Sequence, residues 1–367
     1  ALADPFADRM QLARKVLEKR LGDRGTVPED RCFDGFEGFQ RLLDSGVDMV
    51  ILAEPPHFRP QHIEAGINAG VHVFAEKPMA VDAPGVRRVL AAGEIAERKQ
   101  LSLVSGFETR YSPAAREAVQ RIHDGQLGEI VSIQTTYNTG SLWHRGHQPD
   151  WTEMEFQMRN WYYFTWLSGD HLVEQHVHYN DFVSWVMQDQ PPEHAWGYGG
   201  RQVRVEAKYG DIFDHHAVVY EFAKGVRYYA FTRQQPDTFR ENAKLVMGTK
   251  GQLRSGREYE LLDLGGQPVW QSGPATRHPE LNCFEEMFAA IGEGRPINDS
   301  VAMARSTMQA ILGRMATHGG QLVTWQDAMA SEKDLSPKRY SWDAEPPVLP
   351  RADGTYPSAI PGKTEVL

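Results

Sequence analysis

The residues best suited to chemistry concentrate in one stretch, Gly169 to Asp181, which reads Gly-Asp-His-Leu-Val-Glu-Gln-His-Val-His-Tyr-Asn-Asp. On a continuous helix, steps of three, four and three residues place side chains on one face. The spacing predicts such a face for His171, Glu174, His178 and Asp181. Buried titratable groups cost stability unless they are paired. We therefore interpret this polar stripe as a functional site.

The stripe has the groups needed to oxidise a carbinol. A neutral His178 can take the hydroxyl proton while the carbon loses hydride. Glu174, one turn earlier, can orient the imidazole or bind a neighbouring hydroxyl. Asp181, one turn later, can fix the tautomer through the other ring nitrogen. The alternative is a structural core histidine with a carboxylate partner. The density of the cluster favours the functional interpretation.

A metal site is a competing interpretation of the same stretch. His171, Glu174 and His178 have residue types and a spacing that suit zinc on one helical face. The spacing differs from the zinc-protease signature, however. No further ligand stands out in the sequence. We therefore predict that the site holds no metal.

A second set of candidates follows predicted strands. Lys77, in Glu76-Lys77-Pro78, comes directly after the apolar run 71–75, and Pro55 and His57 follow the run 49–53. In open α/β sheets, ligands bind at the carboxyl ends of the strands. A lysine there can donate a hydrogen bond to a substrate hydroxyl and lower its pKa. A solvated turn lysine is the alternative for this motif taken alone.

Several residues are candidates for substrate contacts. The aromatic run 159–166 includes Trp161 and Tyr162. Their rings suit stacking on a sugar, although core packing or an oligomer interface explains a single ring as well. The predicted substrate-binding residues are Arg110, Arg159, Trp161, Tyr162, His171 and Asp181. We interpret Asp214-His215-His216, which opens a predicted strand, as a feature of a sheet face or an interface.

The order of elements predicts two domains and a tail. Residues 1–110 alternate short apolar strands with helices, which is typical of a parallel α/β sheet. Residues 111–335 carry longer alternating strands at 130–139, 201–206, 214–222, 226–234 and 244–247, which predict an open, mostly antiparallel sheet that is polar on one face. Residues 336–367 are rich in proline. They are expected to form a surface tail.

Composition excludes some classes of protein. The formal net charge is −10. Such a charge argues against a general binder of nucleic acid or anionic membranes. No apolar run approaches the length of a membrane span. The two cysteines, Cys32 and Cys283, predict neither a disulfide framework nor a metal knuckle. The compartment stays open: cytoplasm, or periplasm if an upstream export signal was removed.

These motifs resemble the Gfo/Idh/MocA oxidoreductases, relatives of glucose–fructose oxidoreductase and inositol dehydrogenase. The resemblance rests on Glu76-Lys77-Pro78, on an acid four residues before His178 with an aspartate three after it, on Gly248-Thr249-Lys250-Gly251, and on segment 313–325. It implies an N-terminal Rossmann domain that binds NAD or NADP, and a C-terminal sheet used for homo-oligomerisation. It also implies that Lys77, Glu174 and His178 lie near the nicotinamide, with Glu76 beside them.

The chain departs from the family pattern in two ways. Glu174 stands where the family usually has Asp, and His176 where it usually has Gly, which suggests a subgroup with its own substrate. The glycine-rich turn that cradles the pyrophosphate is absent from the sequence. Residues 1–4 resemble the end of the second Rossmann strand, so Asp4 matches the acid that binds the ribose 2′-hydroxyl and favours NAD. We therefore expect a missing first strand, a gap in the sheet and weak dinucleotide binding.

Three functions follow as hypotheses. The leading one is NAD-dependent oxidation of a secondary hydroxyl of a sugar, polyol or glycoside. The second is an NAD-using glycosidase or lyase that works by transient oxidation and elimination, suggested by the additional His171, Glu174 and His176. The third is a non-catalytic binding protein, suggested by the missing phosphate turn.

Overall fold

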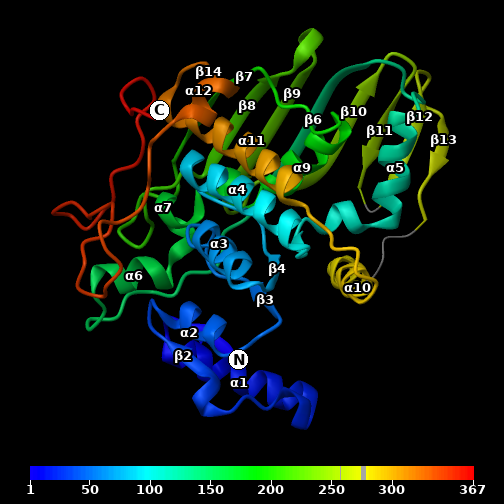
Figure 1. Ribbon diagram of the computed structural model, residues 1–367. Coiled ribbons are helices and arrows are strands. Elements are labelled where there is room, and N and C mark those ends of the chain that lie inside the picture. The colour runs from blue at the N-terminus through cyan, green and yellow to red at the C-terminus, as the bar shows by residue number, and fades with distance from the viewer. Residues whose placement is uncertain (257, 274–277) are drawn as a thin grey trace.

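The computed structural model describes residues 1–256, 258–273 and 278–367. Its strands form three sheets: two small parallel ones and a large, mostly antiparallel one. Helices cover one face of the large sheet and separate it from the parallel strands (Figure 1). This arrangement confirms the predicted α/β class with a second α+β domain.

The parallel part consists of strand–helix units. The first unit contains β1 (Leu2–Asp4), α1 (Ala7–Leu21), β2 (Cys32–Asp34) and α2 (Gly38–Asp44), and the next contains β3 (Met49–Leu52), α3 (Arg59–Ala69), β4 (His72–Ala75), α4 (Ala83–Lys99) and β5 (Leu103–Ser105). Local signals set the helix ends. Gly70 ends α3 at a positive φ of 83°. The Asp82 side chain accepts the backbone N–H of Gly85 at the start of α4.

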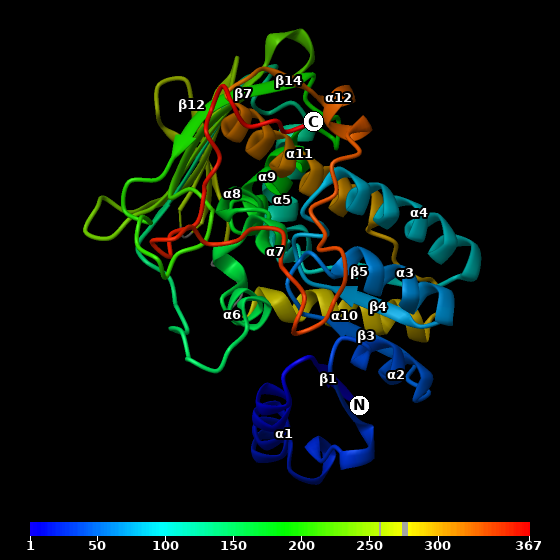
Figure 2. The same cartoon turned by 90° about the vertical axis from the view of Figure 1, so that its left-hand side faces the viewer.

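The expected gap in the parallel sheet is present. β1 pairs with β2, and β3, β4 and β5 pair in that order, but β1 and β3 belong to different sheets. Figure 2 shows the β1–β2 unit set apart from β3–β5. Ile51, in β3, is 59% exposed although its neighbours Val50 and Leu52 are buried. β3 therefore has one unpaired edge in its sheet, and the face that carries Ile51 is uncovered.

The large sheet has nine strands in the order β13-β12-β11-β10-β6-β9-β8-β7-β14. Their bounds are β6 (Ile130–Thr139), β7 (His194–Gly200), β8 (His215–Glu221), β9 (Arg227–Gln234), β10 (Glu241–Gly248), β11 (Gly251–Ser255), β12 (Tyr259–Asp263), β13 (Pro268–Gln271) and β14 (Val323–Thr324). Only the β6–β9 pair in it is parallel. The helices of this part are α5 (Pro113–His123), α6 (Glu153–Arg159), α7 (Thr165–Ser168), α8 (His171–Glu174), α9 (Val177–Val186), α10 (Pro279–Gly292), α11 (Ser300–Gly319) and α12 (Trp325–Ala330).

The predicted strand at 201–206 was wrong. The Asp214 carboxylate accepts the backbone N–H groups of Gln202 and Val203 at 2.6 and 2.7 Å, which folds this segment into a loop. The strand before β8 is β7 instead. Its sequence contains three glycines and a single buried alanine, so it shows no clear alternation of polar and apolar residues. The Asp214 side chain thus accepts the backbone N–H groups that would otherwise pair with a neighbouring strand.

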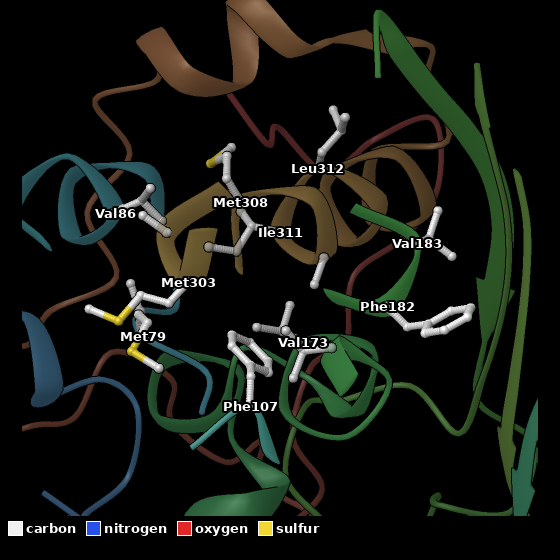
Figure 3. Close-up of a cluster of buried hydrophobic side chains, with 14 of the residues drawn as sticks. Met79, Val86, Phe107, Val173, Phe182, Val183, Met303, Met308, Ile311 and Leu312 are labelled. Atoms are coloured by element: carbon white, nitrogen blue, oxygen red, sulfur yellow. The ribbon is translucent and has the colours of Figure 1, made fainter. Parts of the chain in front are cut away.

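Helix α11 joins the two domains. Its apolar side chains lie between α4 on one side and α8 and α9 on the other (Figure 3). Met303, Met308, Ile311 and Leu312 are fully buried, and Val173 and Phe182 are buried with them. A helix buried almost all round packs against both domains at once. It fixes the parallel strands relative to the helices that carry the polar stretch.

The proline-rich segment after α12 packs against the rest of the chain rather than forming a free surface tail. Tyr356 is 3% exposed, and Trp342 lies 5.1 Å from Phe6 between ring centroids. Both belong to a second cluster with the aromatic residues of α6 and α7. In Figure 2 this segment runs down past α7 toward β3. The burial of these aromatic side chains explains why the segment packs against the chain, which its proline content alone did not indicate.

Candidate functional site

The polar stretch is not one helix, which corrects the sequence-based prediction. α8 ends at Glu174 and α9 begins at Val177. The backbone N–H of His178 bonds to the carbonyl of Gln175 rather than to that of Glu174. The four predicted residues therefore do not share one helical face. The break leaves the Glu174 carbonyl without its i+4 partner, as at any helix end.

Lys77 uses this free carbonyl. Its Nζ atom donates to the Glu174 carbonyl at 2.6 Å and to Glu174 Oε1 at 2.9 Å. The two side chains are only 12% and 9% exposed. Their charges therefore attract in a setting with little solvent screening. Lys77 comes from the carboxyl end of β4 and Glu174 from the end of α8. The structure thus brings together two predicted residues that lie 97 positions apart.

His178 is partly buried at the start of α9. Burial, and then the charges of Lys77 and Lys244, hold its pKa well below the usual value. The imidazole is therefore neutral near pH 7 and can accept a proton. Its ring lies edge-on to Phe107, with centroids 6.3 Å apart. The charge of Lys77 thus acts on the imidazole that the sequence predicts as the base.

Two charged residues near this pair were missed. Lys244, on β10, lies over the rings of Tyr179, Phe182 and Tyr259 at 4.9, 4.8 and 5.7 Å. These distances are typical of cation–π contacts. Burial raises the pKa of Glu108, and the charge of Glu76 adds to that effect. Glu108 follows β5, so its place at a strand end was a usable signal. Lys244 gave none, because a lysine on an antiparallel strand normally faces solvent.

The other polar residues of the stretch lie elsewhere. Asp181 does not orient His178: its Oδ1 accepts from Arg110 and from Ser306, each at 2.8 Å. His171 Nδ1 lies 3.0 Å from Asp170 Oδ1, and both side chains are fully buried. His176 Nε2 contacts Thr135 Oγ1 at 2.9 Å, and burial lowers its pKa to about 3. These imidazoles are packed into the second domain.

The predicted substrate-contact arginines are both engaged in ion pairs. Arg110 donates to Asp181 and, with two nitrogens, to Asp189. Arg159 donates to Glu155 at 2.8 Å and to both oxygens of Asp8 at 3.1 Å. Such bidentate pairs fix the geometry of a guanidinium. Each arginine therefore holds neighbouring segments together in this structure.

The aromatic run forms core rather than an exposed stacking surface. Tyr162 is 2% exposed, and its hydroxyl accepts from Gln234 Nε2 at 2.7 Å. Burial, and then the charge of Glu174, raise its pKa well above the usual value. Trp161 is only partly buried and packs against the same cluster. Of this run, Trp161 keeps a surface that a sugar ring could contact.

The predicted cofactor residues lie at the carboxyl ends of the parallel strands. Asp4 ends β1 and is partly exposed, and burial raises its pKa. Pro55 and His57 follow β3; His57 Nε2 lies 2.7 Å from the Tyr340 hydroxyl, and its Nδ1 is buried without a hydrogen-bond partner among the described residues. Glu76 follows β4 and is partly exposed. The carboxyl ends of parallel strands are where open α/β sheets bind ligands.

Comparison with known families matches both domains. Residues 12–107 match the oxidoreductase family with an NAD-binding Rossmann fold, and residues 115–254 match the GFO/IDH/MocA C-terminal domain. No described helix is long and apolar enough to cross a membrane.

Curated relatives align over parts of their length. The putative oxidoreductase YteT of Bacillus subtilis is 28% identical over 192 residues, which cover 50% of this chain and 39% of the relative. Inositol 2-dehydrogenase 4 of Saccharopolyspora erythraea is 31% identical over 128 residues, covering 33% of this chain and 37% of the relative. The aligned part thus spans well under half of each of these two relatives.

Solved structures share the fold over most of the chain. Aldose-aldose oxidoreductase from Caulobacter crescentus, complexed with glycerol, has a TM-score of 0.65 at 19% identity and covers 88% of this chain and 90% of its own. Levoglucosan dehydrogenase, in complex with NADH and levoglucosan, has a TM-score of 0.65 at 18% identity and covers 88% of each chain. The two family matches, with this shared fold, show that the chain belongs to the Gfo/Idh/MocA family of oxidoreductases.

Proposed function

We propose that the protein is an NAD-dependent oxidoreductase that acts on a secondary hydroxyl of a sugar, polyol or glycoside. The observation that carries this proposal is the contact of Lys77 with both the carboxylate and the carbonyl of Glu174 at the carboxyl end of β4. It holds an ammonium group beside a neutral imidazole, His178. Such a pair suits abstraction of a hydroxyl proton.

The chain's own residues would divide the work as follows. NAD, when bound, supplies the acceptor for the hydride. Lys77 donates a hydrogen bond to the substrate hydroxyl and stabilises the developing alkoxide by its charge. His178 takes the proton from that oxygen. Glu174 holds Lys77 in place, and its Oε2, buried without a partner among the described residues, is an acceptor for a second substrate hydroxyl.

Asp4 supports NAD over NADP. Its carboxylate ends β1 and accepts the Phe6 backbone N–H at 2.8 Å, which leaves its other oxygen for a ribose hydroxyl. A carboxylate at that position would repel a 2′-phosphate. β1 and β3 do not pair with each other. Titration calorimetry that detects tighter binding of NADP than of NAD would contradict this preference.

The activity is tested by incubating the protein with excess NAD and a panel of polyols, aldoses and glycosides. Stoichiometric NADH formation, followed by absorbance, is the expected result. Release of the aglycone from a glycoside without net NADH would identify the elimination reaction instead. No turnover of any compound, with NAD binding demonstrated, would favour a binding protein.

The large sheet supports a homo-oligomer. Two ladders of large side chains cross its outer face, Trp196–Val219–Tyr229 and Tyr198–Ala217–Phe231. Tyr198 is 71% exposed and Phe231 38%. Exposed aromatic patches of this kind mark protein interfaces. Light scattering is expected to give a multiple of the chain mass, and a Phe231→Lys substitution is expected to lower it.

A further inference from the structure

A fully buried cluster of acid and imidazole groups lies at the other end of α8, away from Lys77. Asp170 precedes the helix, His171 begins it, and His216 comes from β8. Asp170 Oδ1 lies 3.0 Å from His171 Nδ1 and 3.3 Å from His216 Nε2. In the part of the chain that the structure describes, these three residues are the group whose donor atoms all lie within 4.8 Å of one another.

The hydrogen bond that His216 makes through Nδ1 leaves the lone pair of its Nε2 atom facing the Asp170 carboxylate. The Thr317 hydroxyl donates to the carbonyls of Gly313 and Arg314, at 3.0 and 3.1 Å. Its oxygen therefore accepts from His216 Nδ1, 3.0 Å away. In this neutral tautomer Nε2 is an acceptor, and it faces a carboxylate oxygen, itself an acceptor, at 3.3 Å. A cation placed between these two acceptors would pair both of them.

Unsatisfied nitrogens give a second, independent sign. His171 Nε2 and His216 Nε2 are both buried, and neither has a hydrogen-bond partner among residues 1–256, 258–273 and 278–367. Buried imidazole nitrogens are normally paired. The rings are adjacent, with centroids 4.7 Å apart. Each residue thus has a ring nitrogen available to bind a metal ion, and the two rings are neighbours.

The surroundings resemble those of a metal site. A ligating histidine usually donates its other ring N–H to an oxygen, as His216 does to Thr317. A ligating carboxylate is held by further donors: Asp170 Oδ2 accepts from His318 Nε2 and from the Phe213 backbone N–H, both at 2.9 Å. His318 also lines a cavity of about 310 Å³. The cavity thus reaches His318, the hydrogen-bond partner of Asp170, although the three cluster residues themselves do not line it.

We propose that Asp170, His171 and His216 form a structural binding site for a divalent transition-metal ion of the zinc class. Two imidazole nitrogens and one carboxylate oxygen are a donor set that suits Zn²⁺. All three side chains are fully buried, so the ion would fasten α8 to β8 rather than meet a substrate. The site differs from the zinc alternative weighed from the sequence, since Glu174 and His178 take no part.

The test uses the full chain after removal of metal by a chelator. Titration with Zn²⁺, and with Co²⁺ followed by its visible absorption, is expected to give one ion per chain and a higher thermal midpoint. His216→Gln removes a ligand while keeping a polar side chain. It is expected to weaken binding by more than the roughly 10–100-fold that loss of a ligand's hydrogen-bond partner costs.

Two further variants separate a ligand effect from a folding effect. Thr317→Val keeps the shape of the side chain but removes the acceptor for His216, and a loss of roughly 10–100-fold is expected. His215→Gln alters the neighbouring imidazole, which pairs with Asp214 instead, and is expected to bind normally. Failure of the unaltered protein to take up Zn²⁺ or Co²⁺ would overturn the proposal and assign a proton to the His216–Asp170 pair. Uptake that His216→Gln leaves unchanged would also overturn it.

Discussion

The two ends of α8 use the same residue types for opposite purposes. At its start, the Asp170 carboxylate is surrounded by imidazole and backbone donors and is fully closed to solvent. At its end, Glu174 meets a single lysine, and the neighbouring His178 is partly exposed. An acid whose two oxygens both accept hydrogen bonds stabilises the fold, whereas an acid with spare acceptor capacity beside a neutral base can bind and react. The comparison predicts that substitutions at the two ends separate activity from stability.

The largest expected effect is on turnover at the reactive end. Lys77→Ala removes the ammonium group that we propose acts on the substrate oxygen, and kcat/KM is expected to fall by roughly 10²–10⁴-fold. NADH formation with saturating polyol measures it. Lys15→Ala, an exposed change in α1, is the matched control. Retention of full activity in Lys77→Ala would remove the distinction between the two ends.

The next effect is on stability at the closed end. Asp170→Asn leaves buried imidazole and backbone donors without their anion, and the free energy of unfolding is expected to fall by about 3–5 kcal/mol. Urea unfolding under chelating conditions measures the change without a contribution from metal. The remaining folded protein is expected to keep its kcat. A loss of kcat with unchanged unfolding would reverse the assignment of roles.

Acid is expected to act differently on the two kinds of histidine. His176 has a pKa of about 3 in the folded state and an ordinary value of 6.5 when unfolded. The unfolded chain therefore binds a proton that the folded chain does not, and stability is lost as pH falls from about 6.5 toward 3. The slope is about 1.4 kcal/mol per pH unit for one such group.

His176→Gln is expected to reduce that slope, and His147→Gln, an exposed change, is expected to leave it unaltered. Urea unfolding at a series of pH values gives both slopes. The protonation of His178 is followed instead through the pH profile of kcat/KM. Because its pKa is held low, activity should persist below the range in which an ordinary histidine is protonated. Loss of activity around pH 6.5 would contradict this.

The smallest expected effect concerns the cofactor edge. Tyr340→Phe removes the contact of 2.7 Å between the tyrosine hydroxyl and His57 Nε2. Loss of one such hydrogen bond is expected to lower the free energy of unfolding by about 0.5–1.5 kcal/mol. Tyr198→Phe, on the exposed face of the sheet, serves as the control. An effect on unfolding as large as that of Asp170→Asn would show that stabilising buried polar contacts are not confined to the start of α8.

Sequence reasoning reached the fold class, and it named Lys77 and Glu174, which the structure brings into contact. Strand ends and glycine turns are local signals, and the division into a parallel and a mostly antiparallel part follows from them. Helix continuity across residues 175–176 was predicted wrongly, because nothing local marks a break that a lysine 97 positions away stabilises. The burial of Tyr162 and the partners of Asp170 depend on tertiary packing. Those contacts are set by distant segments, so spacing along the chain could not give them.

The packing of Phe6 against Trp342 has a consequence for biogenesis. Phe6 cannot reach its final environment until residue 342 has left the ribosome, so this aromatic cluster cannot form before that point of synthesis. Contacts of such large sequence separation form slowly. Until then, the apolar surface of α6 and α7 lacks its cover. A nascent chain stalled before this point would be a natural client for a holdase chaperone.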